Sequence, residues 1–124
     1  MKELIWVGSS LNDLCDFPDE VKHEIGYALY EAQLGLKSSK TKPLSGIASG
    51  VMEIILDHDK NTFRAVYSVK IGNTIYVLHC FQKKSKHGIA TPKQELVLIA
   101  KRLKDAKQIE IMRSNQHDQK NQIH

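Results

Sequence analysis

The sequence predicts a small α+β domain, and three observations carry that prediction. A Gly72-Asn73 pair separates two runs of β-forming residues, which is the signal of a two-residue hairpin. Apolar residues recur at helical spacing on both sides of this β-rich part of the chain. The 124 residues, 41% of them hydrophobic, suffice for one modest core. We therefore expect a small antiparallel sheet, with N-terminal helices and a C-terminal helix packed on one of its faces.

The N-terminal part of the chain predicts one short strand and two helical segments. Residues 4–7 ("LIWV") are typical of a strand, and Ser9 or Ser10 is placed to cap a helical turn after it. A longer helix is expected to begin near Pro18, which suits a first turn, and to end at Gly35. Five apolar residues fall on one face of this helix at helical spacing: Val21, Ile25, Ala28, Leu29 and Ala32.

Residues 37–50 are a loop by composition, and three strands are expected after them: 51–57, 62–71 and 74–82. The second of these strands alternates cleanly, with one apolar face made of Phe63, Ala65, Tyr67, Val69 and Ile71. The hairpin makes the last two strands antiparallel, so the numbers of paired residues sum to about 145. This register places Arg64 opposite a residue near Phe81.

A final helix is expected to begin at residues 91–94 ("TPKQ"), where a Thr N-cap, a Pro at N1 and a Gln at N3 fit a capping box. An apolar stripe follows at helical spacing: Leu96, Ile99, Ala100, Leu103 and Ala106. The end of the chain, "SNQHDQKNQIH", holds one apolar residue and no periodicity. We therefore expect a single domain over residues 1–113 and a disordered polar tail over residues 114–124.

Composition argues against several classes of protein. No apolar run approaches the roughly 18 residues that a membrane-spanning helix needs, and the apolar run at the N-terminus is too short for a signal sequence. Cys15 and Cys80 form no CxxC pair and no cluster with His at zinc-ligand spacing, so both are expected to be buried free thiols. These features indicate a cytoplasmic protein with no metal site and no cofactor.

The charges are distributed unevenly along the chain. Residues 1–36 hold two lysines against seven acids, a balance of −5. Residues 37–124 hold the other 16 Lys and Arg against seven acids, a balance of +9, which gives the net charge of +4. A strongly basic second half is typical of a nucleic-acid surface, although a solvated lysine-rich surface has the same composition.

Several short motifs occur together in an order that resembles a known family: Glu53 in a strand, Phe63-Arg64 with Tyr67, Phe81 with Lys83-Lys84, and "TPK" at residues 91–93. Over residues 4–107 the chain resembles the RelE/ParE superfamily of bacterial toxins, and within it the HigB-like branch of phage-derived killer proteins. This resemblance implies a RelE-like fold and the toxin of a type II toxin–antitoxin pair. It further implies a metal-independent endoribonuclease that cleaves mRNA, in many members on the ribosome, and a helix-turn-helix antitoxin as partner.

Metal-independent RNA cleavage requires deprotonation of the 2′-hydroxyl, stabilisation of the phosphorane charge and protonation of the 5′-oxygen. The resemblance assigns a catalytic role to Arg64, which matches the strand arginine of the family, and to Lys83 and Lys84, which match its basic pair. His87, in the same basic loop, is a candidate acid or base. The structural alternatives are a pairing of Arg64 with Glu53 and a solvated loop for the lysines.

Further residues are expected to bind RNA rather than to react with it: Lys37, Lys40, Lys42, Lys70, Tyr76, Lys86 and Lys93. Tyr76 is expected on the face opposite Tyr67, where it could stack a base. Tyr67 and His79 are expected in the core. The segment 88–107 contains no Tyr or His, whereas several superfamily toxins carry a catalytic Tyr or His in or near the last helix.

Two other functions stay open at this point. A ParE-like toxin would inhibit gyrase without nuclease activity, and a plain binding module would use the basic face without chemistry. The lysine-rich loop and Arg64 favour RNA cleavage over gyrase inhibition, and the binding module stays open.

Overall fold

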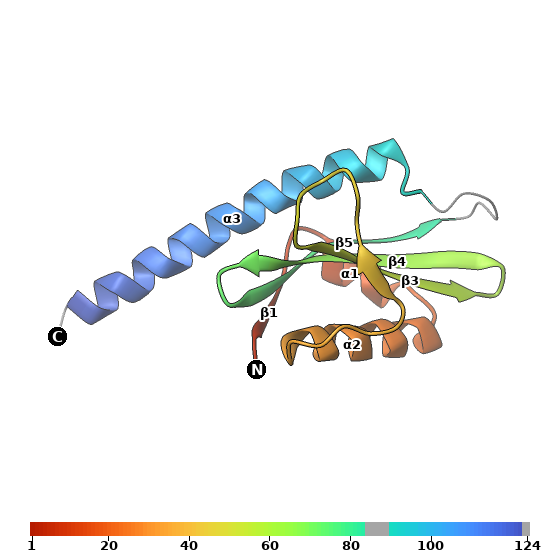
Figure 1. Cartoon of the computed structure of the whole chain (residues 1–124), viewed down its shortest axis with the longest axis horizontal. Coiled ribbons are helices and arrows are strands. Elements are labelled where there is room, and N and C mark those ends of the chain that lie inside the picture. The colour runs from red at the N-terminus through yellow and green to blue at the C-terminus, as the bar shows by residue number, and fades with distance from the viewer. Residues whose placement is uncertain (84–89, 123–124) are drawn as a thin grey trace.

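The computed structural model describes residues 1–83 and 90–122 of the chain. Its elements are β1 (Glu3–Trp6), α1 (Ser10–Cys15), α2 (Asp19–Gln33), β2 (Thr41–Pro43), β3 (Val51–His58), β4 (Asn61–Ile71), β5 (Thr74–Lys83) and α3 (Lys93–Gln122). The strands form one sheet in the order β1-β5-β4-β3-β2 (Figure 1). The predicted α+β class is confirmed. The sheet is mixed rather than wholly antiparallel, because β1 pairs with β5 in parallel.

The β4–β5 hairpin has the predicted register. Gly72 adopts a φ of +57° in the turn, a conformation that favours glycine. Arg64 pairs with Phe81, as the sum rule predicted. Two irregularities, between Val66 and Tyr67 and between Ser68 and Ile71, shift the register in opposite directions and cancel. The pairing beyond the second irregularity therefore returns to the predicted one.

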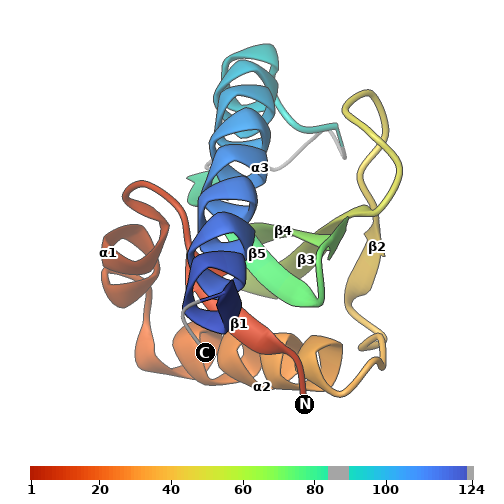
Figure 2. The ribbon, with the colours of Figure 1, turned by 90° about the vertical axis from the view of Figure 1, so that its left-hand side faces the viewer.

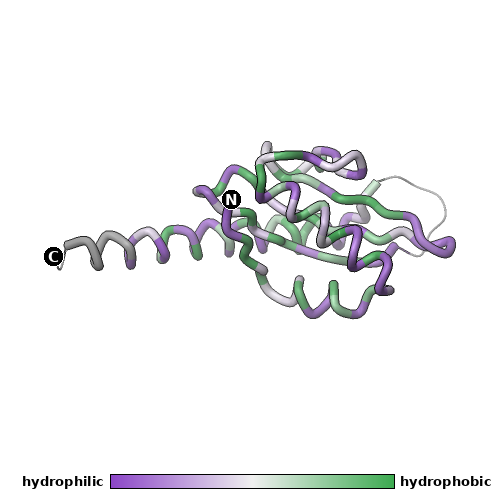
Figure 3. The backbone as a smooth tube through the Cα atoms, turned by 90° about the horizontal axis from the view of Figure 1, so that it is seen from below, coloured by the Kyte–Doolittle hydropathy of each residue, from purple (hydrophilic) through white to green (hydrophobic). Residues whose placement is uncertain are grey.

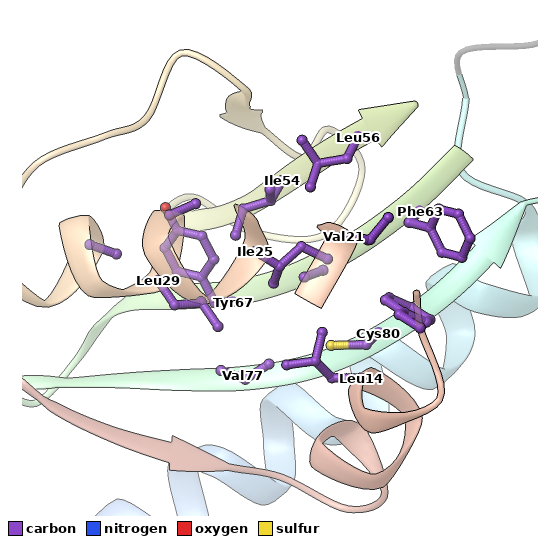
Figure 4. Close-up of a cluster of buried hydrophobic side chains, with 14 of the residues drawn as sticks. Leu14, Val21, Ile25, Leu29, Ile54, Leu56, Phe63, Tyr67, Val77 and Cys80 are labelled. Carbon is purple, nitrogen blue, oxygen red and sulfur yellow. The ribbon is translucent and has the colours of Figure 1, made fainter. Parts of the chain in front are cut away.

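Helices cover both faces of the sheet, so the expectation that they pack on one face is wrong. The helices α1 and α2 lie on one side and α3 crosses the other (Figures 1 and 2). One apolar cluster joins α1 and α2 to the sheet (Figure 4); its members include Leu14, Val21, Ile25, Leu29, Ile54, Phe63, Tyr67 and Val77. A second cluster lies under α3 and includes Val51, Val66, Leu78, Phe81, Ile99, Leu103 and Ala106. Alternate residues of the central strands supply the two clusters over most of their length. The alternation breaks where the register shifts, so Ile71 joins the cluster under α3 and not, as expected, the face of Phe63, Ala65 and Tyr67.

The ends of the helices agree with the sequence at α2 and differ from it at α3. Gly35, with φ of +82°, donates its N–H to Ala32, and Leu36 donates to Glu31, which is a Schellman cap. The expected capping box at Thr91 is wrong, because α3 begins at Lys93 and its first backbone bonds go to the Pro92 carbonyl. The Thr91 hydroxyl bonds elsewhere, as described below.

Two further expectations about boundaries need correction. The segment 37–50 is not a loop throughout, because residues Thr41–Pro43 pair with β3 as the short strand β2. The boundary expected after residue 113 does not coincide with the end of an element, because α3 continues through Gln122; residues 123–124 lie outside the described part, and the disordered tail over 114–124 stays a prediction. Figure 1 shows the C-terminal part of α3 running beyond the edge of the sheet.

Polar side chains fasten α3 to the sheet along its length. Arg102 donates to the Leu78 carbonyl at 3.0 Å and to the Ser9 hydroxyl at 2.8 Å. Further along, the Tyr76 hydroxyl donates to the Glu110 carboxylate at 2.6 Å. Arg113 pairs with Glu3 on the edge strand β1. These contacts fix the middle and the second half of α3 against β5 and β1.

Candidate nucleic-acid interface

A buried ion pair lies on the α3 side of the sheet, near the end of β5 and the start of α3. Arg64 Nη1 donates to Glu53 Oε2 at 3.2 Å, and the two side chains are only 2% and 1% exposed. The Thr91 hydroxyl donates to the same Glu53 oxygen at 2.6 Å and accepts a bond from Arg64 Nη1 at 3.1 Å. Glu53 therefore binds a cation and a hydroxyl, which compensates for its removal from water.

The strand register explains why these residues meet. Glu53 pairs with Val66 and Arg64 with Phe81, and both partners belong to the cluster under α3. Residues directly opposite in a ladder share a face, so both charged side chains point to the α3 side of the sheet. Thr91 reaches them because it lies two residues before the start of α3. The arrangement is the structural alternative considered for Arg64, whose guanidinium bonds to Glu53 and Thr91.

Lys83 occupies the last position of β5 at the same edge. Its Nζ donates to the carbonyl of Ala90 at 2.7 Å, and its side chain is partly exposed. Lys93, the first residue of α3, is exposed. The remaining predicted residues of this basic stretch, Lys84, Lys86 and His87, lie outside the described residues.

The other predicted lysines divide between the two sides of the sheet. Lys42 is exposed on β2 and pairs with Glu53, so it shares the α3 side. Lys70 is exposed, and its Nζ donates to the Ser49 hydroxyl at 3.2 Å. Lys37 lines a hollow with Tyr67, and Lys40 lines a hollow beside α2. The structure therefore brings Lys42 to the side of Lys83 and Lys93, and places Lys37 and Lys40 on the other.

Tyr76 is fully buried, so the expectation that it lies on an open face is wrong. Its ring packs in the cluster under α3, and its hydroxyl bonds to Glu110. Burial, and then the bond to Glu110, raise the pKa of Tyr76. Because α3 covers Tyr76, this residue anchors the helix and its ring cannot stack on an RNA base.

His79 and Tyr67 lie in the core, as predicted. His79 is 6% exposed, contacts Glu95 and Arg102 of α3, and stacks on Phe81 with ring centroids 4.9 Å apart. Tyr67 is 1% exposed, and burial raises its pKa. The two cysteines differ from each other: Cys80 is buried as expected, whereas the expectation for Cys15 is wrong because it is exposed.

The described residues contain no group of three or more His, Cys, Asp or Glu side chains placed to hold a metal ion. No helix within the described ranges is long and apolar enough to cross a membrane.

Comparison with known proteins assigns this chain to a family. The family described as "Phage derived protein Gp49-like (DUF891)" matches residues 12–104, which is more than half of the chain. The chain belongs to this Gp49-like family. A solved structure titled as the isolated E. coli RelE toxin matches with a TM-score of 0.53 at 17% identity. The match covers 83% of the present chain and 99% of the RelE chain. No curated protein sequence matches.

The Gp49-like chain thus has a RelE-like fold, and the resemblance to the RelE/ParE superfamily predicted from the sequence is confirmed. Sequence reasoning missed Thr91 as a partner of Glu53, because the hydroxyl was interpreted as a helix cap. One signal was available: Glu53 stands inside the apolar run "VMEIIL", where a carboxylate needs a buried partner.

Proposed function

We propose that this Gp49-like chain is the toxin of a type II toxin–antitoxin pair and acts as a metal-independent endoribonuclease on mRNA, on the ribosome and in the cytoplasm. Family membership and the RelE-like fold support the class of protein. The observation that supports the chemistry is the position of Lys83. Its ammonium group lies at the end of β5, above a buried ion pair and on the same side of the sheet as Lys42 and Lys93.

In the proposed reaction the 2′-oxygen of one nucleotide attacks the neighbouring phosphorus. The 2′-oxygen loses its proton, the phosphorane gains negative charge, and the 5′-oxygen leaves with a proton. The products are a 2′,3′-cyclic phosphate and a free 5′-hydroxyl. Lys83 stabilises the charge on the phosphorane oxygens, and Lys42 and Lys93 attract the RNA backbone. Lys84, Lys86 and His87 stay candidates for the same site, His87 as acid or base.

Arg64 enters this proposal as a positioning residue. Its side chain is 2% exposed and bonds to Glu53 and to Thr91, two residues before the start of α3, so it holds the segment that leads into the helix. Lys83 bonds to Ala90, the residue just before Thr91. The ion pair therefore determines where Lys83 and Lys93 stand relative to each other.

Mapping of RNA ends tests the proposal. The wild type, Lys83→Gln, Lys83→Arg and the control Lys107→Gln, an exposed lysine on α3, are each expressed briefly in bacteria. Sequencing of 5′-hydroxyl ends is expected to show new cuts in mRNA for the wild type and Lys107→Gln, few for Lys83→Gln, and partial recovery for Lys83→Arg.

The alternatives predict different results. DNA breaks with intact mRNA would identify a gyrase inhibitor. If neither the DNA nor the mRNA is cut, the remaining interpretation is a binding module. Cleavage that persists unchanged in Lys83→Gln would remove Lys83 from the site while leaving the ribonuclease assignment in place.

A further inference from the structure

The outer face of α2 carries large apolar side chains that nothing in the described chain covers. Tyr27 is 65% exposed, Tyr30 46% and Leu34 46%, and they follow one another at spacings of three and four residues. This spacing puts them in one stripe, opposite the stripe that packs on the sheet. We call Tyr27, Tyr30 and Leu34 the outer stripe.

An acidic border runs beside the outer stripe. Glu20, Glu24 and Glu31 lie along one edge of it, and Glu24 and Glu31 line an open hollow of about 660 Å³ between α2, residues 38–40 and Leu56. Over Asp19–Gln33 the helix holds four acids and one lysine, a balance of −3. Figure 3, seen from the α2 side, shows hydrophilic and hydrophobic residues alternating along the helix.

This surface has the wrong charge for RNA. The chain as a whole is basic, yet its first 36 residues have a balance of −5, and α2 lies across the sheet from α3, the helix that begins at Lys93 (Figure 2). A polyanion is repelled by an acidic border, and among the described residues the lining of the hollow includes one lysine, Lys40, and one histidine, His23. An occupant of the outer stripe must instead combine apolar side chains with positive charge.

We propose that the outer stripe is a docking surface for a basic amphipathic helix of a partner protein. Its apolar side chains lie on Tyr27, Tyr30 and Leu34, and an Arg or Lys side chain enters the hollow between Glu24 and Glu31. Exposed tyrosines supply large contact area at low entropic cost, and a charge entering a hollow between two carboxylates fixes the register. The site is separate from the proposed site of RNA cleavage and does not depend on it.

A second copy of this chain fits the surface less well. Two α2 helices meeting across a two-fold axis would bring acidic borders together, which costs free energy. Contact of α2 with the basic side of another copy would be a heterologous interface, which leads to rings or open filaments. A basic helix of a different protein would neither bring two acidic borders together nor lead to rings or filaments.

Two synthetic helical peptides test the proposal. Both present leucines at positions i, i+3 and i+7; one carries arginines beside this face and the other carries glutamates at the same positions. Binding is measured by fluorescence anisotropy to the wild type, Tyr27→Ser/Tyr30→Ser and Glu24→Gln/Glu31→Gln. Val97→Ser is the matched control, because Val97 is 63% exposed on α3 at the other side of the sheet. Circular dichroism verifies that each variant is folded.

The arginine peptide is expected to bind the wild type and Val97→Ser equally, and both double variants at least tenfold more weakly. The glutamate peptide is expected not to bind. Absence of binding by the arginine peptide, equal affinity of the variants, or equal binding of both peptides overturns the proposal. Displacement of the peptide by a single-stranded RNA overturns it in favour of RNA. Self-association in sedimentation velocity that Tyr27→Ser/Tyr30→Ser abolishes overturns it in favour of a second copy.

Discussion

Arg64 Nη1 lies 3.2 Å from Glu53 Oε2 in a part of the protein from which water is excluded, since the two side chains are 2% and 1% exposed. Such a pair contributes little net stability when both charges are present, but the removal of one leaves the other buried without its partner. Thr91 bonds to both residues, so the pair also fixes the start of α3.

Arg64→Ala is therefore expected to destabilise the fold by about 3–5 kcal/mol, because Glu53 would be left charged in the interior. Urea denaturation at neutral pH measures this free energy of unfolding. The double variant Glu53→Leu/Arg64→Met, which removes both charges, is expected to lose less stability than Arg64→Ala alone. A fully stable Arg64→Ala protein that no longer cleaves RNA would contradict the positioning role and return Arg64 to direct catalysis.

Lys83→Gln is expected to do the opposite of Arg64→Ala: it should change the free energy of unfolding little and slow RNA cleavage strongly. Lys83 is partly exposed at the end of a strand, so its loss should change the free energy of unfolding by under about 0.5 kcal/mol. Loss of a group that stabilises a developing anion costs about 2.7–4 kcal/mol of barrier, or roughly a hundred- to a thousandfold in rate. Cleavage of an mRNA transcript in a translation extract, beside urea denaturation of the same preparations, measures both. A stability loss as large as that of Arg64→Ala would make Lys83 structural.

The sequence predicted the hairpin because its signals are local. Gly72-Asn73 and the alternation in β4 define both the turn and the pairing of Arg64 with Phe81. The side on which α3 packs is not a local property, since an apolar stripe looks the same whichever face it covers. One sign was present: residues 75–78 of β5 are apolar without interruption, which is typical of a strand buried on both faces.

The candidate site was less predictable, because its parts come from distant positions. Thr91 lies 38 residues from Glu53, and only the fold brings the hydroxyl to the carboxylate. The exposure of Tyr76 was predicted from strand alternation, which says which face a side chain points to but not whether a helix covers that face. Lys37 and Lys40 were grouped with the other lysines by charge, and the path of the chain around β2 separates them.

Cys80 makes the stability depend on pH in the alkaline range. Burial raises the pKa of its thiol from 9.0 to about 12, so the folded state holds the proton more tightly than the unfolded state does. The resulting stabilisation is complete below pH 9 and is lost as the pH rises toward about 12. Tyr67 and Tyr76, whose pKa values are also raised from 10.0, add to the loss above pH 10.

Cys80→Ala is therefore expected to flatten the fall in stability just above pH 9, where one thiol contributes at most about 1.4 kcal/mol per pH unit. The slope of the free energy of unfolding against pH is the quantity to compare, because the alanine also leaves a small cavity. Cys15→Ala is the control, because it removes a thiol at an exposed position. Equal slopes for the wild type and Cys80→Ala would show that the thiol does not titrate in this way.

The last prediction concerns the length of α3 that the fold needs. Glu110 binds the Tyr76 hydroxyl, and Arg113 pairs with Glu3, whereas residues 114–116 are exposed. The helix passes the edge of the sheet in this region (Figure 1). Among the side chains that the structure describes, the stabilising contacts of the helix thus reach as far as Arg113.

The free energy of unfolding of a chain that ends after Arg113 is expected to lie within about 0.5 kcal/mol of that of the full chain, because exposed residues contribute little. A chain ending after Gln108 loses the Tyr76–Glu110 bond, and a hydrogen bond to a charged group contributes about 1.5–3 kcal/mol. It is therefore expected to be less stable by at least that amount. Urea denaturation compares both with Glu110→Gln, which removes only the charge at the bond. A large loss on ending at Arg113 would show that the helix docks beyond that residue.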